Sequence, residues 1–277
     1  WPHIDGKPVD FISYDNCGPA ASMNSSVVDM MKWIKLQLGK GTADKSTIFS
    51  EETYYKMVSP VTMLNAGPAE TIGERHFSGC GLGWFLHDYQ GRKIIEHGGG
   101  LPGFHSKVVL VPEENLGYVI LANQLSGLVE AIYKKILDFY LVTDGKDWVQ
   151  LYYEGELKQM AQKLEKEKQQ EAARVDGTQP TLRPEEYAGL FEDPMYGKAE
   201  VLFENDQLIL VMHPTNKLFT GLLEHWHYNT FKVKFNDLFL PPGFVTFTIS
   251  GEGKAEGFTI DLENPDFHFF KLRFLKE

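Results

Sequence analysis

The chain has 277 residues, 43% of them apolar, and a formal net charge of −11. This size allows one large or two ordinary globular domains, and the acidic balance disfavours nucleic acid or an anionic membrane surface as a partner. No stretch approaches the roughly 20 apolar residues that a membrane-spanning helix needs. The start, WPHIDGKP, has neither an initiating Met nor a signal-peptide pattern, so we expect a processed form or a fragment.

Two helices are predicted in the first part of the chain. The stretch NSSVVDMMKWIKLQLGKG places apolar side chains at helical spacing, at Val27, Met30, Met31, Ile34 and Leu38. Asn24 and Ser25 are its candidate N-caps, and Gly39 is a candidate stop. The stretch SEETYYKMVSP predicts a shorter helix with Ser50 as N-cap and Pro60 at its end.

From Gly81 the pattern changes to strands. The runs GLGWFLHDY, RKIIEHG, HSKVVLVP and GYVILANQ are rich in β-formers and are separated by QG, GGLPG and EENLG. Short connections between successive strands predict an antiparallel sheet. The next run, SGLVEAIYKKILDFYL, is expected to form a helix that packs on this sheet through an apolar stripe at Leu128, Ile132, Ile136 and Phe139.

The remainder predicts a linker and a second domain. Residues 151–182 are mostly charged, with a thin apolar stripe at Leu157, Met160 and Leu164, and predict a solvated helical linker. Residues 183–277 alternate apolar and polar side chains between turns at END, PPG, SGEG and ENPD, which favours an all-β barrel or sandwich. The closing run FHFFKLRF alternates as a core strand would. We therefore expect an α+β domain at 1–150 before the linker.

The stretch HGGGLPGF, residues 97–104, raises the question of function. Three glycines between two strands can be a turn or bulge that needs positive φ. Alternatively, the missing side chains let a substrate lie against backbone N–H groups, with His97 as a proton donor or hydrogen-bonding group. The glycines alone do not separate these two interpretations.

Two families of glycine-rich sites fit poorly. Phosphate-binding loops need GxxxxGK[ST], or GxGxxG followed by a helix, whereas a strand follows these glycines. The HGGG loop of α/β-hydrolase esterases is closer in letters, but those enzymes need a later GxSxG nucleophile, and the chain has none. No motif calls for a cofactor, and we expect none.

A third family matches over most of the chain. The segment YDNCGPAASMNSSVVDMMKWIKLQLGKG resembles the part of the serine β-lactamase and penicillin-binding-protein superfamily where a Gly/Ala-rich loop leads into an amphipathic helix. HGGGLPGFHSKVVLVPEENLGYVILANQ is similar to its third active-site motif and last two strands. The tail from LRPEEYAGLFED resembles the small all-β domain of unknown function that often follows in bacterial members.

The resemblance implies a fold and site residues. The fold is a partial β-lactamase- or transpeptidase-like domain, an antiparallel sheet with flanking helices, followed by an all-β barrel-like domain. The third motif, on the edge strand of the active-site sheet, aligns His97 with the family's Lys or His, Gly98 with the middle position and Gly99 with its glycine. The Gly100 N–H then corresponds to one of two oxyanion donors. His97, Gly99 and Gly100 are the implied catalytic residues, and Gly98 is the implied substrate-binding residue.

The nucleophile of that family is missing from the sequence. It is the Ser of Ser-x-x-Lys, and no serine of this chain has Lys three positions later. Tyr14 and Asn16 match the second motif, Tyr-x-Asn, in letters, but in the family that motif lies well upstream of the Gly/Ala loop. We therefore expect the C-terminal portion of a serine hydrolase acting on a β-lactam, a D-amino-acid peptide or an ester, inactive alone. The alternative is a non-catalytic module that binds a ligand or protein.

The expected partners follow from this interpretation. They are a small-molecule or peptide substrate and the missing N-terminal half of the catalytic domain, or self-association of exposed edges. Family resemblance implies a periplasmic or secreted protein. The redox state of Cys17 and Cys80 stays open; two cysteines exclude a disulfide-rich scaffold and a four-cysteine zinc site.

Two other parts of the sequence contain weaker candidate sites. HWH places His225 and His227 on one face of a strand, as a metal pair without a third ligand or as ordinary surface histidines. Glu96 and Asp88 could form a glycosidase-like carboxylate pair, but nothing fixes their separation, and we expect ordinary solvent-facing residues.

Overall fold

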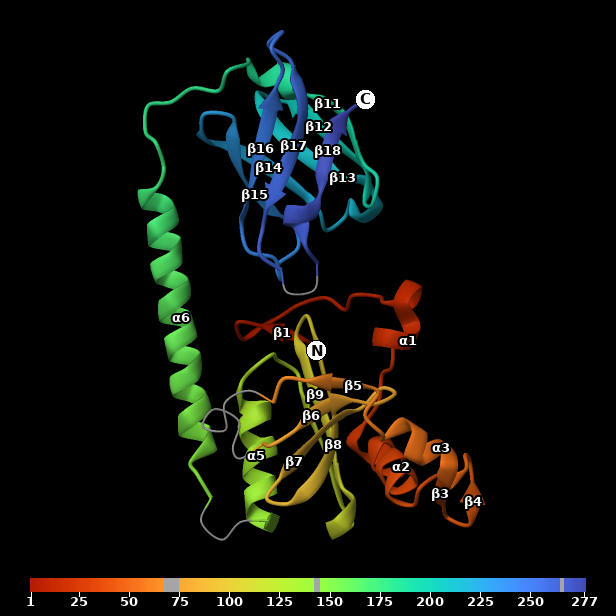
Figure 1. Ribbon diagram of the computed structural model, residues 1–277. Helices are drawn as coiled ribbons and strands as arrows, with labels where there is room; N and C mark the ends of the chain where they lie inside the picture. The colour runs from red at the N-terminus through yellow and green to blue at the C-terminus, as the bar shows by residue number, and fades with distance from the viewer. Residues whose placement is uncertain (67–74, 142–144, 265–266) are drawn as a thin grey trace. The chain divides into compact units, whose positions relative to one another are not determined.

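The structure is a computed structural model that describes residues 1–66, 75–141, 145–264 and 267–277 (Figure 1). The chain divides into two compact units, Trp1–Gln162 and Lys163–Glu277. None of the helices in the described ranges combines the length and apolar character needed to cross a membrane.

Unit 1 is built on an antiparallel sheet, as predicted. Its six strands lie in the order β10-β9-β8-β7-β6-β5. Their bounds are Thr62–Leu64 (β5), Ser78–Cys80 (β6), Phe85–Tyr89 (β7), Arg92–Leu101 (β8), Phe104–Val111 (β9) and Leu116–Ala122 (β10). Two short hairpins accompany the sheet: β1 (His3–Ile4) with β2 (Lys7–Pro8), and β3 (Thr42–Ala43) with β4 (Ser46–Thr47).

Helices cover both faces of this sheet (Figure 1). On one face, α2 (Val27–Leu38) and α3 (Glu51–Met57) pack over a cluster that includes Ile95 and Leu110. On the other, α5 (Leu128–Leu141) covers a cluster that includes Ile94 and Val109. A short α1 (Gly18–Ala21) precedes α2. The sheet is therefore buried between two helical layers.

Two details of the predicted helices were wrong. The N-cap of α2 is Ser26, whose hydroxyl accepts the Asp29 N–H, and not Asn24 or Ser25. The apolar stripe of α5 was misplaced: Leu128 and Phe139 are 53% and 78% exposed. The buried face instead carries both apolar and polar side chains, at Val129, Ala131, Tyr133, Lys134, Leu137 and Asp138. Apolar spacing alone missed this face because two of its buried side chains, Lys134 and Asp138, are charged.

A long helix, α6 (Trp148–Ala172), leads into unit 2. Unit 2 is a closed barrel of eight antiparallel strands, which decides between the barrel and sandwich predicted from the alternation. The strands are Gly189–Asp193 (β11), Gly197–Glu204 (β12), Gln207–Met212 (β13), Thr220–His227 (β14), Thr230–Phe235 (β15), Gly243–Ile249 (β16), Ala255–Asp261 (β17) and Arg273–Lys276 (β18). Pairing of Phe191 with Lys276 closes the barrel, so neither end strand has a free edge.

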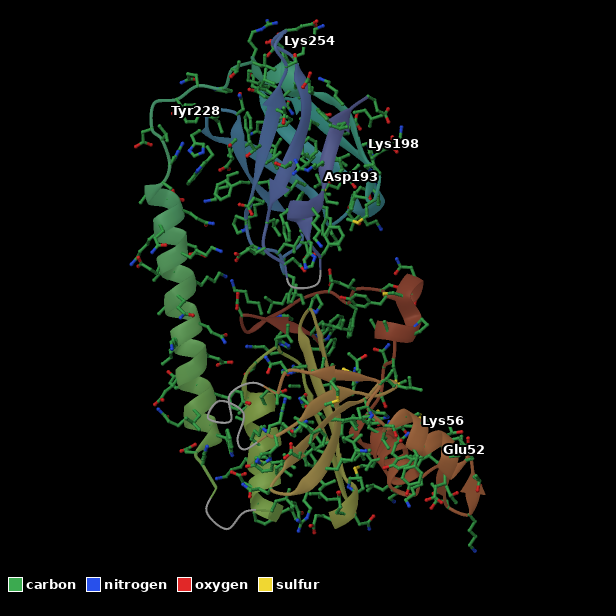
Figure 2. All side chains as sticks on the ribbon, in the orientation of Figure 1. Glu52, Lys56, Asp193, Lys198, Tyr228 and Lys254 are labelled. Atoms are coloured by element: carbon green, nitrogen blue, oxygen red, sulfur yellow. The ribbon has the colours of Figure 1, made fainter. Side chains whose placement is uncertain are left out.

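Aromatic side chains fill the barrel. Phe258 is 2% exposed and stacks on Phe274 with ring centroids 4.7 Å apart. A buried carboxylate completes one end: Asp193 accepts the N–H groups of Met195, Tyr196 and Arg273 (Figure 2). Although burial opposes its ionisation, these three donors lower the pKa of Asp193. They tie the β11–β12 turn to β18.

The closing run of the chain differs from the expected core strand. Phe269–Lys271 form a 3-10 helix, η5, and only Arg273–Lys276 form a strand. Phe270 is 60% exposed, whereas Phe269 and Phe274 are buried. Of the four predicted turns, ENPD lies partly outside the described residues.

Helix α2 packs closely against β10 at Gly117. A Cβ on Gly117 would lie 2.4 Å from the Ile34 Cγ2, so the helix would have to move. We expect Gly117→Ala to lower the free energy of unfolding of unit 1 by about 1–3 kcal/mol in urea denaturation. Gly155→Ala is the control, because a Cβ there meets nothing within 4 Å and an alanine inside α6 should add about 0.5–1 kcal/mol. Equal effects of the two alanines would contradict the packing account.

Candidate active site

The glycines of HGGG lie inside a strand. β8 continues through Gly98, Gly99 and Gly100 to Leu101, and only Pro102 and Gly103 form the turn into β9. The run GGLPG was therefore wrongly expected to separate two strands. The pairing of β8 with β9 runs from Ile95 to Leu101 without a register shift, so no bulge interrupts it.

Backbone geometry does not require glycine at these positions. Positive φ occurs at Gly103, with φ 80°, but at none of the three glycines before it. A Cβ on Gly98 would meet only ordinary contacts, the nearest at 3.5 Å. On Gly99 it would approach only the mobile Ser106 hydroxyl, at 2.8 Å, and on Gly100 only a Leu125 methyl, at 3.1 Å. The explanation by a turn, a bulge or positive φ does not apply.

One edge of this glycine segment has no neighbouring strand among the described residues of the sheet. β7 pairs with β8 only as far as Phe85, which lies opposite Glu96. The resemblance implied an edge strand, but β8 lies between two strands over 92–96 and has an open side only from His97 onward. The difference arises because β5, β6 and β7 extend the sheet beyond β8.

The strand alternation determines which backbone groups face this open side. In an antiparallel sheet, successive residues direct their N–H and C=O groups to alternate neighbours. The backbone N–H and C=O groups of Glu96 face β7, where Glu96 pairs with Phe85. Those of Leu101 face β9, because Leu101 and Phe104 close the two-residue turn. Gly98 and Gly100 therefore present their N–H groups on the same side as Glu96, beyond the end of β7. Either group can donate a hydrogen bond to a negatively charged oxygen. Because a strand rises about 3.3 Å per residue, the two N–H groups lie about 6.6 Å apart and cannot share one oxygen.

His97 lies beside these donors on the face covered by α2 and α3. The His97 Nδ1 lies 2.7 Å from the Gly83 carbonyl oxygen, and its ring centroid lies 5.7 Å from that of Phe85. Because a carbonyl oxygen only accepts, Nδ1 carries the hydrogen of this bond. The Nε2 of this exposed side chain then faces away from Gly83 and can accept or donate a proton.

A buried ionic cluster supports the opposite face of the same strand. Lys107, paired in register with Gly98, forms ion pairs with Glu96 and, at 3.0 Å, with Glu130 of α5. Glu96 and Lys107 are each 8% exposed. The Tyr133 hydroxyl lies 2.9 Å from the Nε2 of His87, which is itself 1% exposed. These contacts join β7, β8, β9 and α5 directly behind the glycines.

The expectation for the two carboxylates was wrong. Glu96 is buried in this cluster and does not face solvent. Asp88 accepts the N–H groups of His76 and Phe77, and its side chain is 13% exposed. The two point to opposite faces of the sheet and cannot act as a catalytic pair. A lysine inside the apolar run HSKVVLVP was the signal that could have revealed the cluster.

The buried imidazole makes the stability of unit 1 depend on pH. Burial, and then nearby cationic side chains, lower the pKa of His87 from 6.5 to about 2. Below pH 6.5 the unfolded chain binds a proton that the folded chain does not, so stability falls by up to about 1.4 kcal/mol per pH unit. Between pH 7 and pH 5 we expect unit 1 to lose about 2 kcal/mol more in the wild type than in His87→Gln. Denaturant titrations at both pH values that give parallel losses would contradict this.

The other candidate residues belong to elements other than the glycine strand. Asn16 falls in the 3-10 helix η1, Asp15–Cys17, and Tyr14 is its N-cap. The imidazoles of His225 and His227 are each engaged by backbone, with the Tyr228 C=O and the Val175 N–H, across a bulge in β14. The described residues contain no group of three side chains suited to a metal. Both cysteines are free thiols.

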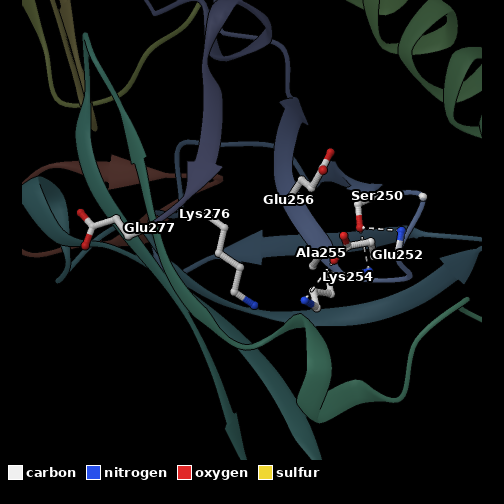
Figure 3. Close-up of a pocket in the computed structure, with 8 residues that line it drawn as sticks. Ser250, Glu252, Lys254, Ala255, Glu256, Lys276 and Glu277 are labelled. Atoms are coloured by element: carbon white, nitrogen blue, oxygen red, sulfur yellow. Dashed lines mark hydrogen bonds and ion pairs between the residues drawn. The ribbon is translucent and has the colours of Figure 1, made fainter.

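Two hollows of the described surface offer no better site. One of about 500 Å³ lies at an end of the barrel (Figure 3). Its lysines are already engaged, Lys254 with Glu252 at 3.2 Å and Lys276 with the Ala188 C=O at 2.8 Å. A second, of about 390 Å³, lies between α2 and the start of β10 and is largely apolar. Neither contains any residue of the glycine segment.

Comparison with known proteins decides the family. Residues 1–143, more than half of the chain, match the family described as Beta-lactamase. The chain belongs to the beta-lactamase family. Residues 173–276 match a domain of unknown function, DUF3471, which agrees with the resemblance of the barrel.

Individual relatives of this beta-lactamase family chain are distant. Protein flp of Staphylococcus aureus is 31% identical over 105 residues, covering 38% of this chain and 18% of its own length. Unguisins hydrolase ungD of Aspergillus violaceofuscus is 27% identical over 199 residues, covering 67% of this chain and 35% of its own. The chain thus spans about a fifth to a third of these relatives. A solved octameric penicillin-binding protein homologue from Pyrococcus abyssi aligns with 91% of this chain and 47% of its own, at 16% identity and a TM-score of 0.36.

Proposed function

We propose that residues 97–100 form one wall of the active site of a serine hydrolase. The observation that carries the proposal is the open side of β8, where the N–H groups of Gly98 and Gly100 lie next to the His97 imidazole. Membership of the beta-lactamase family supports it, as does the hydrolase named among the relatives.

Each residue has a specific role in the proposed reaction. A serine hydroxyl attacks the carbonyl carbon of a β-lactam, a D-amino-acid peptide or an ester, and the carbonyl oxygen becomes negatively charged. The Gly100 N–H donates to that oxygen. His97, held by Gly83, orients the substrate or transfers a proton through Nε2. Gly98 and Gly99 leave room for the acyl group against the strand. The C–N or C–O bond of the substrate then breaks, and the leaving nitrogen or oxygen takes up the proton that the serine hydroxyl has lost. Water attacks the acyl-serine ester, which releases the acid and restores the serine hydroxyl.

The attacking serine belongs, in this proposal, to a segment outside the sequence. No serine of the chain has the lysine three positions later that activates the nucleophile in this family. The chain alone would then be inactive. Two serines do occur near the site, but Ser106 only approaches the Gly99 C=O, at 3.4 Å, and Ser126 holds the Leu128 N–H.

Covalent labelling tests this proposal. We expect neither a fluorophosphonate nor a fluorescent penicillin to form an adduct with the purified chain, as judged by intact mass. The complete protein, expressed from its full gene, should be labelled by at least one probe on a serine outside residues 1–277. An adduct on any serine of the chain would place the nucleophile here and refute the proposal. A complete protein that binds substrate analogues without labelling would favour a non-catalytic binding module.

A further inference from the structure

One face of helix α6 packs against the other elements of unit 1. The Glu156 Oε1 accepts the Gly127 N–H near the start of α5, at 2.5 Å. The indole of Trp148, 6% exposed, donates to the Asp138 carboxylate. Trp148, Tyr152 and Glu156 follow one another at four-residue spacing and so share this face.

A second face of α6 is apolar and exposed. Its four large side chains are separated by four, three and four residues, the spacing of the a and d positions of a heptad. Each is about half exposed or more, at 56%, 47%, 67% and 53% for Tyr153, Leu157, Met160 and Leu164 respectively. At about 100° per residue, this stripe lies about 110° around the helix from the Trp148 face. None of the contacts described above for α6 involves the four side chains of the stripe, which are exposed to this extent among the described residues. We call this stripe the α6 seam.

The seam is self-complementary when two copies run antiparallel. Pairing Leu157 with the Met160 of a second copy also brings Tyr153 opposite its Leu164, so every apolar side chain meets an apolar one. The flanking positions on one side are Glu156, whose Oε1 also accepts the Gly127 N–H, and Lys163. In the antiparallel arrangement the Glu156 of each copy faces the Lys163 of the other, which gives two contacts between opposite charges per pair of helices.

A parallel pair of helices lacks this pairing of opposite charges. In a parallel coiled coil, each residue at the g position faces the residue five positions later on the partner helix. Lys163 would then face Lys168, a repulsive contact, and Glu156 would face Ala161. Charge therefore distinguishes the two orientations, and it favours the antiparallel one.

We propose that the α6 seam is a docking surface for a second copy of this chain, with the two helices antiparallel. The interface covers the four apolar side chains of the seam, which are otherwise exposed to water. It is independent of the proposed active site, since none of its residues belongs to β8 or β9. With four apolar side chains from each copy, the interface is small, and the dimer should dissociate on dilution.

The experiment measures the oligomeric state of the purified chain by analytical ultracentrifugation over a wide concentration range. We expect a monomer–dimer equilibrium that Leu157→Glu weakens at least about tenfold, because a charge replaces a central apolar contact. The matched control is Leu151→Glu, since Leu151 is 46% exposed on another face of the same helix. Circular dichroism checks that both variants keep their helix. A monomer at every concentration, or equal weakening by both variants, would overturn the proposal.

A charge reversal tests the orientation. In the antiparallel dimer, Lys163→Glu places two carboxylates opposite each other and should weaken the dimer about three- to tenfold. In a parallel dimer the same change would relieve the repulsion by Lys168 and tighten association, which would refute the antiparallel arrangement. Lys158→Glu makes the same charge change away from the seam and should leave the dissociation constant unchanged.

Discussion

Under the proposed function, replacing His97 by alanine in the complete protein is expected to lower kcat/KM by about 10²- to 10⁴-fold, the usual cost of losing an acid–base or electrostatic group. His97 directly precedes the glycines of the open side of β8, and its side chain is exposed there. Steady-state kinetics on an activated ester or a chromogenic β-lactam would measure the loss.

Two further variants separate chemistry from positioning. His97→Asn keeps an N–H group that can reach the Gly83 C=O but has no group that titrates near neutral pH. If His97 transfers a proton, this variant should remain slow and lose the pH dependence of kcat. His213→Ala, on the barrel, removes a partly exposed histidine far from β8 in sequence and should leave the rate unchanged. An unchanged rate in folded His97→Ala would show that His97 has no catalytic role.

Replacing Lys107 by methionine is expected to lower the free energy of unfolding of unit 1 by about 3–5 kcal/mol, because it leaves the carboxylates of Glu96 and Glu130 without their cation. The effect is large because Glu96 is 8% exposed, so water cannot replace the lost ammonium group. Urea denaturation followed by tryptophan fluorescence would measure it, since Trp84 and Trp148 are buried in unit 1.

The double variant distinguishes a lost ion pair from lost packing. Adding Glu96→Gln to Lys107→Met removes the uncompensated charge and should restore a substantial part of the stability. Lys32→Met is the control: its ion pair with Asp29 is exposed, with side-chain exposures of 74% and 60%, and should contribute at most about 1 kcal/mol. The contradicting result would be additivity: a double variant whose loss of unfolding free energy equals the sum of the losses in Lys107→Met and Glu96→Gln. The ion pair between Lys107 and Glu96 would then not explain the effect.

Much of the fold could be predicted from residue patterns, since it follows from local rules. Alternating apolar side chains with short turns indicated both the antiparallel sheet and the barrel, and Ser50 and Gly39 marked helix ends. Alternation alone does not distinguish a barrel from a sandwich, because the barrel depends on pairing between β11 and β18, about 80 residues apart. The barrel-like domain expected from the family resemblance is confirmed by that pairing.

The errors arose where polar side chains are buried. The buried face of α5 contains Lys134 and Asp138, which a search for apolar spacing rejects. Glu96 was expected to face solvent because its pairing with Lys107 joins two strands, and no periodicity within one strand reveals it. The glycines were singled out from the sequence as a turn or a site, but their strand conformation became evident only from the register with β9.

The most direct test of the active-site wall is a crystal structure of the complete protein carrying a phosphonate adduct on its nucleophilic serine. We predict that a phosphoryl oxygen of the adduct lies about 2.7–3.1 Å from the Gly100 nitrogen, with the His97 imidazole lining the same cavity. An adduct bound away from β8, with the Gly98 and Gly100 N–H groups covered by another segment of the protein, would contradict the assignment.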